Sequence, residues 1–348
     1  MKIAVDAMGG DYAPKEIVEG VELARDAYPD IEFLLFGLTD QIQKYLKNDT
    51  RIDVKQADEV IEMGDEPVKA VRSKKHSSMV LAATAVKEGQ ADAFFSAGNT
   101  GAILASGLFI IGRIKGIDRP GLATTLPVVS TDTDQKNFVM LDVGANADTK
   151  VLNMYQYALL GKYYAANVMN VANPKIGLLN NGTEADKGDM DHRKVHDLLA
   201  ADQDLQFIGN VESRELLNGA ADVVVTDGFT GNAVLKSIEG TALSMLHLIK
   251  GSILSGGMTS KLGAAMLKGT FGEIAKSMDY SQYGGAVLMG VKAPVVKTHG
   301  STKAPTVKNT IGQIKQMIDS KLIPDLNDYL TGHADQLQEI KETIKNGK

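Results

Sequence analysis

Short apolar runs rich in β-branched residues alternate with longer stretches of helical periodicity along most of the chain. The first run, residues 3–6, is followed by a Gly-Gly turn and by a helical pattern over residues 14–27, which begins with proline. This order, repeated many times, predicts a mostly parallel sheet with helices on both faces. Further strands are expected at residues 31–36, 93–96, 121–129, 138–143, 175–180, 205–208 and 221–226, and further helices at residues 77–88, 103–111, 152–169, 192–199 and 233–248.

The alternation breaks after Lys250. Residues 251–278 carry apolar side chains at helical spacing together with several lysines, which predicts two short amphipathic helices around Gly269. A basic amphipathic segment inside an acidic protein favours contact with a membrane surface, although a dimer interface or ordinary core packing would give a similar pattern. The residues expected to make membrane contact are Leu254, Met258, Lys261, Leu262, Ala265 and Met266.

The C-terminal region returns to shorter elements. A strand is expected at residues 287–297 and a helix at residues 308–322, before a polar end that is typical of a surface helix. We therefore expect one α/β domain over residues 1–330, which includes the helical pair at residues 250–280, and a polar helix or tail over residues 331–348.

Composition narrows the class of protein. A chain of 348 residues with 44% hydrophobic residues can bury a large core. The formal net charge of −6 argues against a general nucleic-acid binder, and the lack of cysteine excludes disulfides, a thiolate nucleophile and Cys-based metal sites. Because the chain opens directly on a strand pattern and has no long apolar run, we expect neither a signal peptide nor a membrane span, and a cytoplasmic location.

Turns rich in glycine and amide residues follow several of the predicted strands. Such turns aim backbone N–H groups at bound anions, most clearly at residues 96–101 and 227–232, although a helix cap is the alternative at each. Residues 142–148 form a similar turn, but their carboxylates would repel an anion, so they are expected to shape the cleft or to bind a hydroxyl or amide group. The candidate phosphate- and substrate-binding residues are Asp6, Gly9, Gly10, Gly98, Asn99, Thr100, Gly101, Asn146, Asp227, Gly228, Gly231 and His299.

Lys187 and Asn232 are the sharpest catalytic candidates. A lysine in such a turn is usually a solvated surface residue, and an asparagine at a helix start is usually a cap. Both, however, follow strands of one sheet, where they could converge on one ligand. The pair His192 and His196 has metal-like spacing but lacks a third ligand, so we expect an exposed helix face and no metal site.

The missing motifs narrow the chemistry further. The chain has no G-x-G-x-x-G fingerprint, no Walker A sequence and no G-x-S-x-G nucleophile elbow. Anion-binding turns, a lysine and amides without a covalent nucleophile suit a reaction in which the bound anion itself attacks. Phosphate attacking a thioester is such a reaction, because the leaving thiolate has a pKa of roughly 8–9 and needs little acid assistance.

These segments together resemble the bacterial phosphate acyltransferases, which convert fatty acyl-[acyl-carrier-protein] and phosphate to acyl phosphate at the start of phospholipid synthesis. The resemblance extends in order along nearly the whole chain. The matching segments are residues 6–14, 96–102, 119–127, 142–148, 177–188, 209–212, 222–236, 279–285 and 299–301.

The resemblance implies a Rossmann-like doubly wound α/β/α sandwich, similar to isocitrate dehydrogenases and phosphotransacetylases, with a protruding amphipathic helical pair. It implies a cytosolic homodimer at the membrane surface, no metal or organic cofactor, and delivery of the acyl phosphate to a membrane glycerol-3-phosphate acyltransferase. The family's catalytic lysine falls on Lys187 and its active-site asparagine on Asn232. Asn181 and Thr183 depart from the family pattern without touching Lys187.

Two alternatives remain open from the residues alone. One is a short-chain phosphotransacetylase that uses acyl-CoA, which the turns do not distinguish from an enzyme acting on acyl carrier protein. The other is a non-catalytic peripheral membrane protein that recruits lipid enzymes through residues 251–278. Arg72, Lys74 and Lys75 are candidates for docking the acidic carrier protein, and His299 for assisting as a base, beside the plainer readings of a solvated face and a structural histidine.

Overall fold

The computed structural model describes residues 1–277 and 280–345. The end of the predicted helical pair at Met278 and the end of the predicted tail, residues 346–348, lie outside these ranges. Within them the strands form one sheet in the order β3-β2-β1-β4-β11-β10-β5-β6-β9-β7-β8. The strands are β1 (Lys2–Asp6), β2 (Glu32–Gly37), β3 (Ile52–Gln56), β4 (Ala93–Ser96), β5 (Gly121–Pro127), β6 (Asn137–Leu141), β7 (Lys175–Asn180), β8 (Gln206–Glu212), β9 (Val223–Val225), β10 (Ala286–Met289) and β11 (Val295–Lys297).

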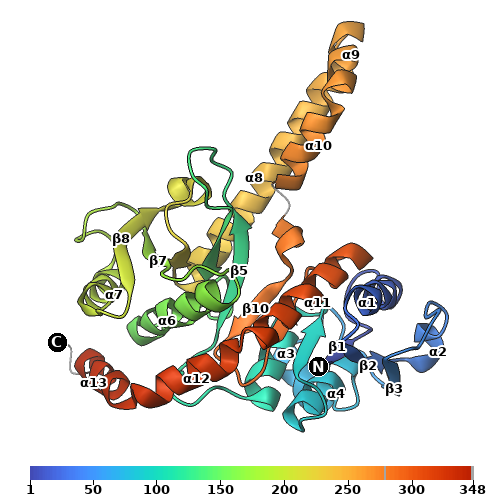
Figure 1. The fold of residues 1–348 in the computed structure, drawn as a ribbon, viewed down its shortest axis with the longest axis horizontal. Coiled ribbons are helices and arrows are strands. Elements are labelled where there is room, and N and C mark those ends of the chain that lie inside the picture. The colour runs from blue at the N-terminus through green and yellow to red at the C-terminus, as the bar shows by residue number, and fades with distance from the viewer. Residues whose placement is uncertain (278–279, 346–348) are drawn as a thin grey trace.

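Helices cover both faces of this sheet, as the strand–helix alternation predicts (Figure 1). The α-helices are α1 (Lys15–Ala27), α2 (Thr39–Ile42), α3 (Pro67–Ser73), α4 (Ser78–Lys87), α5 (Thr100–Ser106), α6 (Val151–Asn167), α7 (Met190–Ala201), α8 (Gly228–Ser255), α9 (Met258–Met266), α10 (Lys268–Ser277), α11 (Ala304–Asp319), α12 (Leu322–Gly332) and α13 (Ala334–Lys345). The shorter turns are the π-helix η1 (Gly107–Ile111) and the 3-10 helices η2 (Ser213–Asn218) and η3 (Tyr280–Tyr283).

The sheet consists of two parallel halves that run in opposite directions. β3, β2, β1, β4 and β11 are parallel, and so are β6, β9, β7 and β8. Between them β10 is antiparallel to both β11 and β5, and β5 is antiparallel to β6. Because this centre reverses direction three times, the carboxyl ends of the two halves point in opposite directions. The expectation of a mostly parallel sheet is correct, but its turns do not all lie along one edge.

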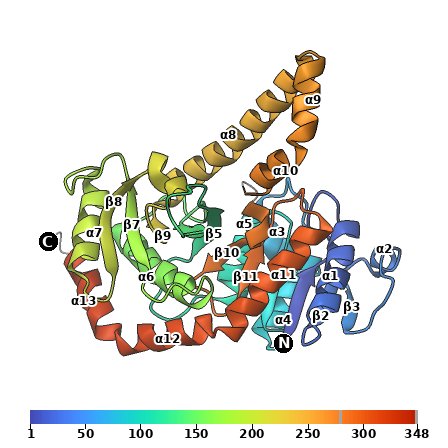
Figure 2. The ribbon, with the colours of Figure 1, turned by 45° about the horizontal axis from the view of Figure 1, so that its top comes forward.

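The core lies on both faces of the sheet. Ile3 and Val5 of β1 pack with α1 and α11, whereas Ala4 between them packs with α4 on the opposite face. Figure 2 shows α12 along the bottom of the molecule, between α11 and α13, with α6 above it. An apolar run buried on both sides in this way is typical of parallel strands.

One expected strand, residues 287–297, is wrong. The structure divides it into β10 and β11, which pair antiparallel through Ala286 with Lys297 and Val287 with Val296. Gly290 in the connection has a φ of +91°, a conformation that favours glycine. The apolar sequence continues through the turn, so the pattern alone reads as one strand.

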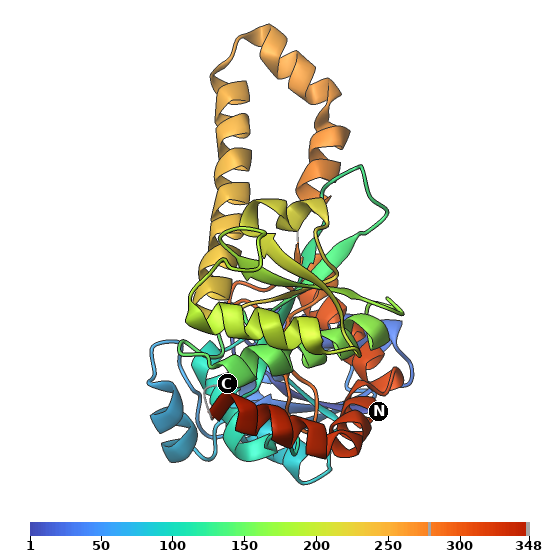
Figure 3. The same ribbon diagram turned by 90° about the vertical axis from the view of Figure 1, so that its left-hand side faces the viewer.

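The predicted helical pair protrudes from the body of the molecule (Figure 3). It begins earlier than expected, because α8 continues without interruption from Gly228 to Ser255 before α9 and α10 return. All six residues predicted to contact a membrane are exposed, with Met258 77% and Met266 83% exposed. Within residues 1–277 and 280–345, no helix combines the length and hydropathy that a bilayer-spanning segment needs.

The C-terminal helices differ in part from the expectation. The predicted helix at residues 308–322 is α11, and α12 follows it as a separate helix. The predicted polar tail contains α13, whose Leu337 is buried against the main core beside α6. The division into one domain over residues 1–330 stays a prediction.

Candidate active site

A cavity of about 380 Å³ lies at the centre of the sheet, over β5 and β10. Both halves of the sheet contribute to it, because the turns that follow β4 and β11 meet the first turns of α8 there. Its lining includes Asp11, Gly98, Thr100, Leu122, Thr124, Val143, Gly144, Asn232, Leu235, Lys236, Glu239, Gly285, Ala286, Lys297, Thr298, His299 and Gly300. Four of the residues predicted from the sequence, Gly98, Thr100, Asn232 and His299, therefore share one cavity.

The turn between β4 and α5 offers donors to this cavity. Asn99 caps α5, since its Oδ1 accepts from the N–H of Ala102 at 3.1 Å, and its Nδ2 donates to three carbonyls of the loop at residues 62–65. The N–H groups of Thr100 and Gly101 have no hydrogen-bond partner among the described residues. Asn99 is thus the scaffold of a turn that keeps free donors, and its role as an anion site stays a prediction.

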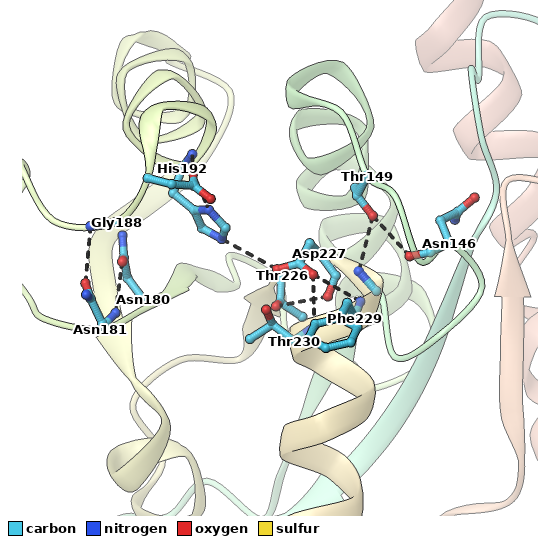
Figure 4. Close-up of polar contacts among 12 residues, drawn as sticks. Asn146, Thr149, Asn180, Asn181, Gly188, His192, Thr226, Asp227, Phe229 and Thr230 are labelled. Carbon is cyan, nitrogen blue, oxygen red and sulfur yellow. Dashed lines mark hydrogen bonds and ion pairs between the residues drawn. The ribbon is translucent and has the colours of Figure 1, made fainter.

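The turn between β9 and α8 is different, because its donors are already used (Figure 4). Asp227 Oδ1 accepts from the N–H groups of Phe229 at 3.0 Å and Thr230 at 2.8 Å. The N–H of Gly228 donates to Thr149 Oγ1 at 3.2 Å, and that of Gly231 to the Asp227 carbonyl at 2.9 Å. The helix-cap interpretation, which the sequence left open, accounts for this turn.

Close packing explains the glycines of that turn. A Cβ at Gly228 would lie 2.2 Å from the Asn146 carbonyl oxygen, and one at Gly231 would lie 1.9 Å from that of Asp142. The loop and the helix are thus in direct contact. Asn232 follows in the next position and lies against Gly144, which brings its amide to the cavity.

Lys187 lies outside the cavity lining, on the turn after β7. β7 pairs in parallel with β9, so this turn and the start of α8 are neighbours as expected. The Lys187 side chain is 45% exposed, with Nζ 4.0 Å from Glu184 Oε2. His192 connects the two turns, since its Nε2 lies 3.7 Å from Asp227 Oδ2 (Figure 4). That Lys187 and Asn232 face the same bound phosphate stays a prediction.

Asp6 is a buried scaffold. Its two carboxylate oxygens accept from the hydroxyl groups of Ser78 at 2.6 Å and Ser96 at 2.7 Å. Burial raises the pKa of Asp6, against the lowering effect of these hydrogen bonds. A Cβ at Gly9 would lie 2.6 Å from Asp6 Oδ2, and Gly10 adopts a φ of +114°. These three residues hold the first turn against β4, next to the cavity.

Asn146 also supports a loop. Its Nδ2 donates to the Pro120 carbonyl at 2.8 Å, to Asp142 Oδ2 at 2.9 Å and to the Tyr157 hydroxyl at 2.8 Å. Burial raises the pKa of Asp142, which accepts four backbone N–H groups besides this amide. Asn146 thus fixes the loop that follows β6 and is absent from the lining of the central cavity, so its binding of substrate stays a prediction.

His299 lines the cavity, and its Nδ1 is already in use. Its Nδ1 accepts from the N–H of Ser301 at 3.2 Å and lies 2.8 Å from the Ser301 hydroxyl. A neutral imidazole that accepts at Nδ1 carries its proton on Nε2. His299 therefore suits a contact to an anion or a carbonyl oxygen better than the role of a base.

The sequence reasoning missed Lys297, Lys236 and Thr298. Lys236 pairs with Glu239 at 2.7 Å on α8. Burial, with a smaller contribution from nearby Lys236, lowers the pKa of Lys297 from 10.5 to about 8. The Thr298 hydroxyl is buried and has no hydrogen-bond partner among the described residues. A lysine directly after an apolar strand and before Thr-His-Gly was the available signal, but it reads as an ordinary surface position.

The described residues contain no group of three or more potential His, Cys, Asp or Glu ligands arranged for a metal ion. His192 bonds to Asp189 at 2.9 Å, and His196 packs edge-on against Phe207. Both histidine side chains are mostly buried, at 15% and 14% exposed, so the expectation of an exposed helix face is wrong.

Comparison with known proteins identifies the family. The family model described as fatty acid synthesis protein matches residues 1–324. The chain belongs to this family. It is 70% identical over 345 residues to a protein of Levilactobacillus brevis named Phosphate acyltransferase, which covers 99% of this chain and 100% of the relative. It is 63% identical over 329 residues to a protein of the same name from Lactiplantibacillus plantarum, which covers 94% of each chain. The expectation of an acyltransferase enzyme is thereby confirmed at the level of the family.

Solved structures confirm the fold class. A phosphotransacetylase from Streptococcus pyogenes superposes with a TM-score of 0.61 at 16% identity, covering 93% of this chain and 94% of that one. A branched-chain phosphotransacylase from Enterococcus faecalis V583 gives a TM-score of 0.59 at 14% identity, covering 91% of this chain and 99% of that one. The family member thus has the phosphotransacetylase-like α/β fold that its sequence predicts.

Proposed function

We propose that this protein transfers a fatty acyl group from acyl carrier protein to inorganic phosphate and releases acyl phosphate. One observation carries the proposal: the central cavity gathers the donors of the β4–α5 turn, Lys297 and His299 opposite the Asn232 amide. These groups suit a phosphate and a carbonyl oxygen that gains negative charge. The name shared by the relatives supports phosphate as the acceptor and an acyl group as the cargo.

The reaction proposed is direct displacement. A phosphate oxygen forms a bond to the thioester carbonyl carbon, and the C–S bond breaks as the thiolate leaves. Asn232 is assigned as a donor to the carbonyl oxygen, a contribution worth on the order of 100-fold in rate. Lys187, on the adjoining turn, is assigned to neutralise phosphate or the developing oxyanion. Positioning of phosphate by the cavity supplies much of the remaining acceleration.

This protein has a basic surface beside the cavity, which is complementary in charge to an acidic carrier protein. Arg113, Arg119 and Lys150 line a second hollow of about 610 Å³ together with Leu108 and the exposed Phe109. Arg72, a docking candidate from the sequence, lies over the Phe109 ring at 5.8 Å. Lys74 is committed to an ion pair with Asp65 at 2.6 Å. We propose that the carrier docks on the arginines of this surface.

The decisive assay mixes the purified protein with phosphate and either palmitoyl-acyl carrier protein or acetyl-CoA, and measures acyl phosphate. Turnover with the carrier-linked donor is expected. Preference for acetyl-CoA would establish the short-chain phosphotransacetylase alternative. Lys187→Ala and Asn232→Ala are each expected to lower kcat by about 100-fold or more without lowering thermal stability. Full activity of Lys187→Ala would remove that residue from the mechanism.

The protruding helices α8, α9 and α10 are proposed to bring the enzyme, as a cytoplasmic homodimer, to the membrane surface where a membrane glycerol-3-phosphate acyltransferase takes the product. The exposed Leu262 and Met266 support this, with Lys261 beside them for anionic headgroups. The double change Leu262→Asp and Met266→Asp should abolish sedimentation with anionic liposomes. Met190→Asp, at a methionine 72% exposed on α7, is the matched control and should bind like the wild type.

The outcome of that experiment separates the proposals. Unchanged liposome binding by the double variant would refute membrane contact through this hairpin. Liposome binding by a wild-type protein that produces no acyl phosphate from any donor would instead establish the non-catalytic recruiter.

A further inference from the structure

Lys297 lines the central cavity at a position that neither Lys187 nor Asn232, the expected catalytic residues, occupies. It is the last residue of β11, and its register partner on β4 is Ser96, the first residue of the anion-binding turn. On the other side it pairs with Ala286 of β10. Lys297 therefore lines the cavity from the strand that adjoins the β4–α5 turn, where the N–H groups of Thr100 and Gly101 have no hydrogen-bond partner among the described residues.

The next residue gives independent evidence of a ligand at this place. Thr298 is 4% exposed and lines the cavity, and its hydroxyl has no hydrogen-bond partner among the described residues. A buried hydroxyl without a partner costs about 1–3 kcal/mol, so such groups are ordinarily satisfied by a protein group, a water or a ligand. A phosphate held between Lys297 and the β4–α5 turn supplies the missing acceptor.

The charged groups around Lys297 act on its pKa in opposite directions. Burial is the main cause that lowers its pKa to about 8, and Lys236 on α8 adds to it, while Glu239 acts in the opposite direction. Lys236 is itself paired with Glu239. Asp11 and His299 are the other titratable residues of the lining. An amine of this kind exchanges a proton readily at neutral pH.

We propose that Lys297 accepts the proton of monoanionic phosphate in this cavity and returns it to the leaving thiolate. The first transfer moves a proton from a phosphate O–H to Nζ and leaves dianionic phosphate beside an ammonium. A phosphate oxygen then bonds to the carbonyl carbon, and the C–S electron pair departs with sulfur. The thiolate takes the proton from Nζ, which restores the neutral amine. A thiolate pKa of roughly 8–9 suits this exchange.

This inference rests on the proposed acyl transfer to phosphate, but its first step is tested without an acyl donor. Calorimetric titration of the wild-type protein with inorganic phosphate at pH 8, in buffers of different ionisation enthalpy, measures the protons taken up on binding. The bound state after the first transfer is an ammonium beside dianionic phosphate, whereas at pH 8 free phosphate is already mostly dianionic and Lys297, with a pKa of about 8, is about half protonated. Reaching that state therefore takes up about half a proton per phosphate. Lys297→Arg should bind phosphate with no proton uptake. Lys44→Met, at an exposed lysine far along the chain, should match the wild type.

The second step is tested by turnover. Lys297→Arg keeps the charge without a proton to exchange, so its phosphate KM should stay within a few-fold while kcat falls by about 100-fold or more. Lys297→Met should instead weaken phosphate binding, and thermal unfolding checks that each variant is folded. Wild-type proton uptake or wild-type kcat in Lys297→Arg would overturn the inference. A wild-type protein that takes up the proton yet forms no acyl phosphate would refute the proposed function alone.

Discussion

Gly231 lies on α8 directly before Asn232, at a position that has no room for a side chain. A Cβ at this position would lie 1.9 Å from the Asp142 carbonyl oxygen and 2.7 Å from the Thr226 methyl group. Ordinary carbon contacts begin near 3.5 Å, so Gly231→Ala must separate the helix and the loop by roughly 1.5 Å. Overpacking typically costs 1–3 kcal/mol. Because a backbone oxygen has no rotamer to escape to, we expect a loss of about 3 kcal/mol in the free energy of unfolding.

The same displacement should reduce activity. Asn232 is the next residue and lies beside Gly144 of the displaced loop, where an added Cβ would come within 3.4 Å of the Asn232 side chain. A misplacement of about 1 Å at a reacting centre costs on the order of 100-fold in rate. Urea unfolding followed by circular dichroism measures the stability, and phosphate-dependent acyl transfer measures the rate.

Gly240 provides a matched control on the same helix. A Cβ there would meet nothing within 4 Å, so Gly240→Ala should stabilise α8 by about 0.5–1 kcal/mol. If Gly231→Ala proved as stable and as active as Gly240→Ala, the close contact between α8 and the Asp142 loop would not limit the site, and the packing explanation of Gly231 would be wrong.

Two further predictions concern the cavity. The folded-state pKa of Lys297 is depressed, so the stability tied to its neutral form is present above pH 10.5 and lost as pH falls through about 8. Lys297→Met should therefore raise the unfolding free energy at pH 7 by about 3 kcal/mol, a gain that shrinks in the same urea titration at pH 9.5. Thr298→Val removes an unpaired hydroxyl, so stability should hold while calorimetry finds weaker phosphate binding. Thr310→Val, which loses a bond to the Thr306 carbonyl at 2.8 Å, should cost about 1 kcal/mol and leave phosphate binding unchanged. Equal phosphate binding by both threonine variants would exclude Thr298 from the site.

The parts of the fold that depend on local pattern were predictable from the sequence. β4 and β7 begin and end at the expected residues, because each is a short apolar run bounded by polar residues or a turn. The antiparallel centre was not predictable in this way. It depends on the pairing of β10 with β5, two segments far apart in the chain, and no periodicity records the direction in which distant strands meet.

The same distinction between local pattern and long-range contact applies to the site residues. The turn at Gly98–Gly101 has a local signature and lies at the cavity, whereas the similar turn at Gly228–Gly231 is occupied by its own cap, Asp227. Which of two such turns keeps free donors depends on side-chain contacts. Lys297 was missed because its importance comes from its place beside β4 in the sheet, which its neighbours in sequence do not reveal.

The unbroken length of α8 fixes a distance between chemistry and surface. At about 1.5 Å per residue, the helix from Asn232 to Ser255 spans roughly 35 Å, about the diameter of a small domain. A hairpin whose far end rests on a bilayer therefore acts as a spacer. Under the proposed membrane contact, it holds the cavity away from the lipid and leaves a gap for the proposed carrier protein.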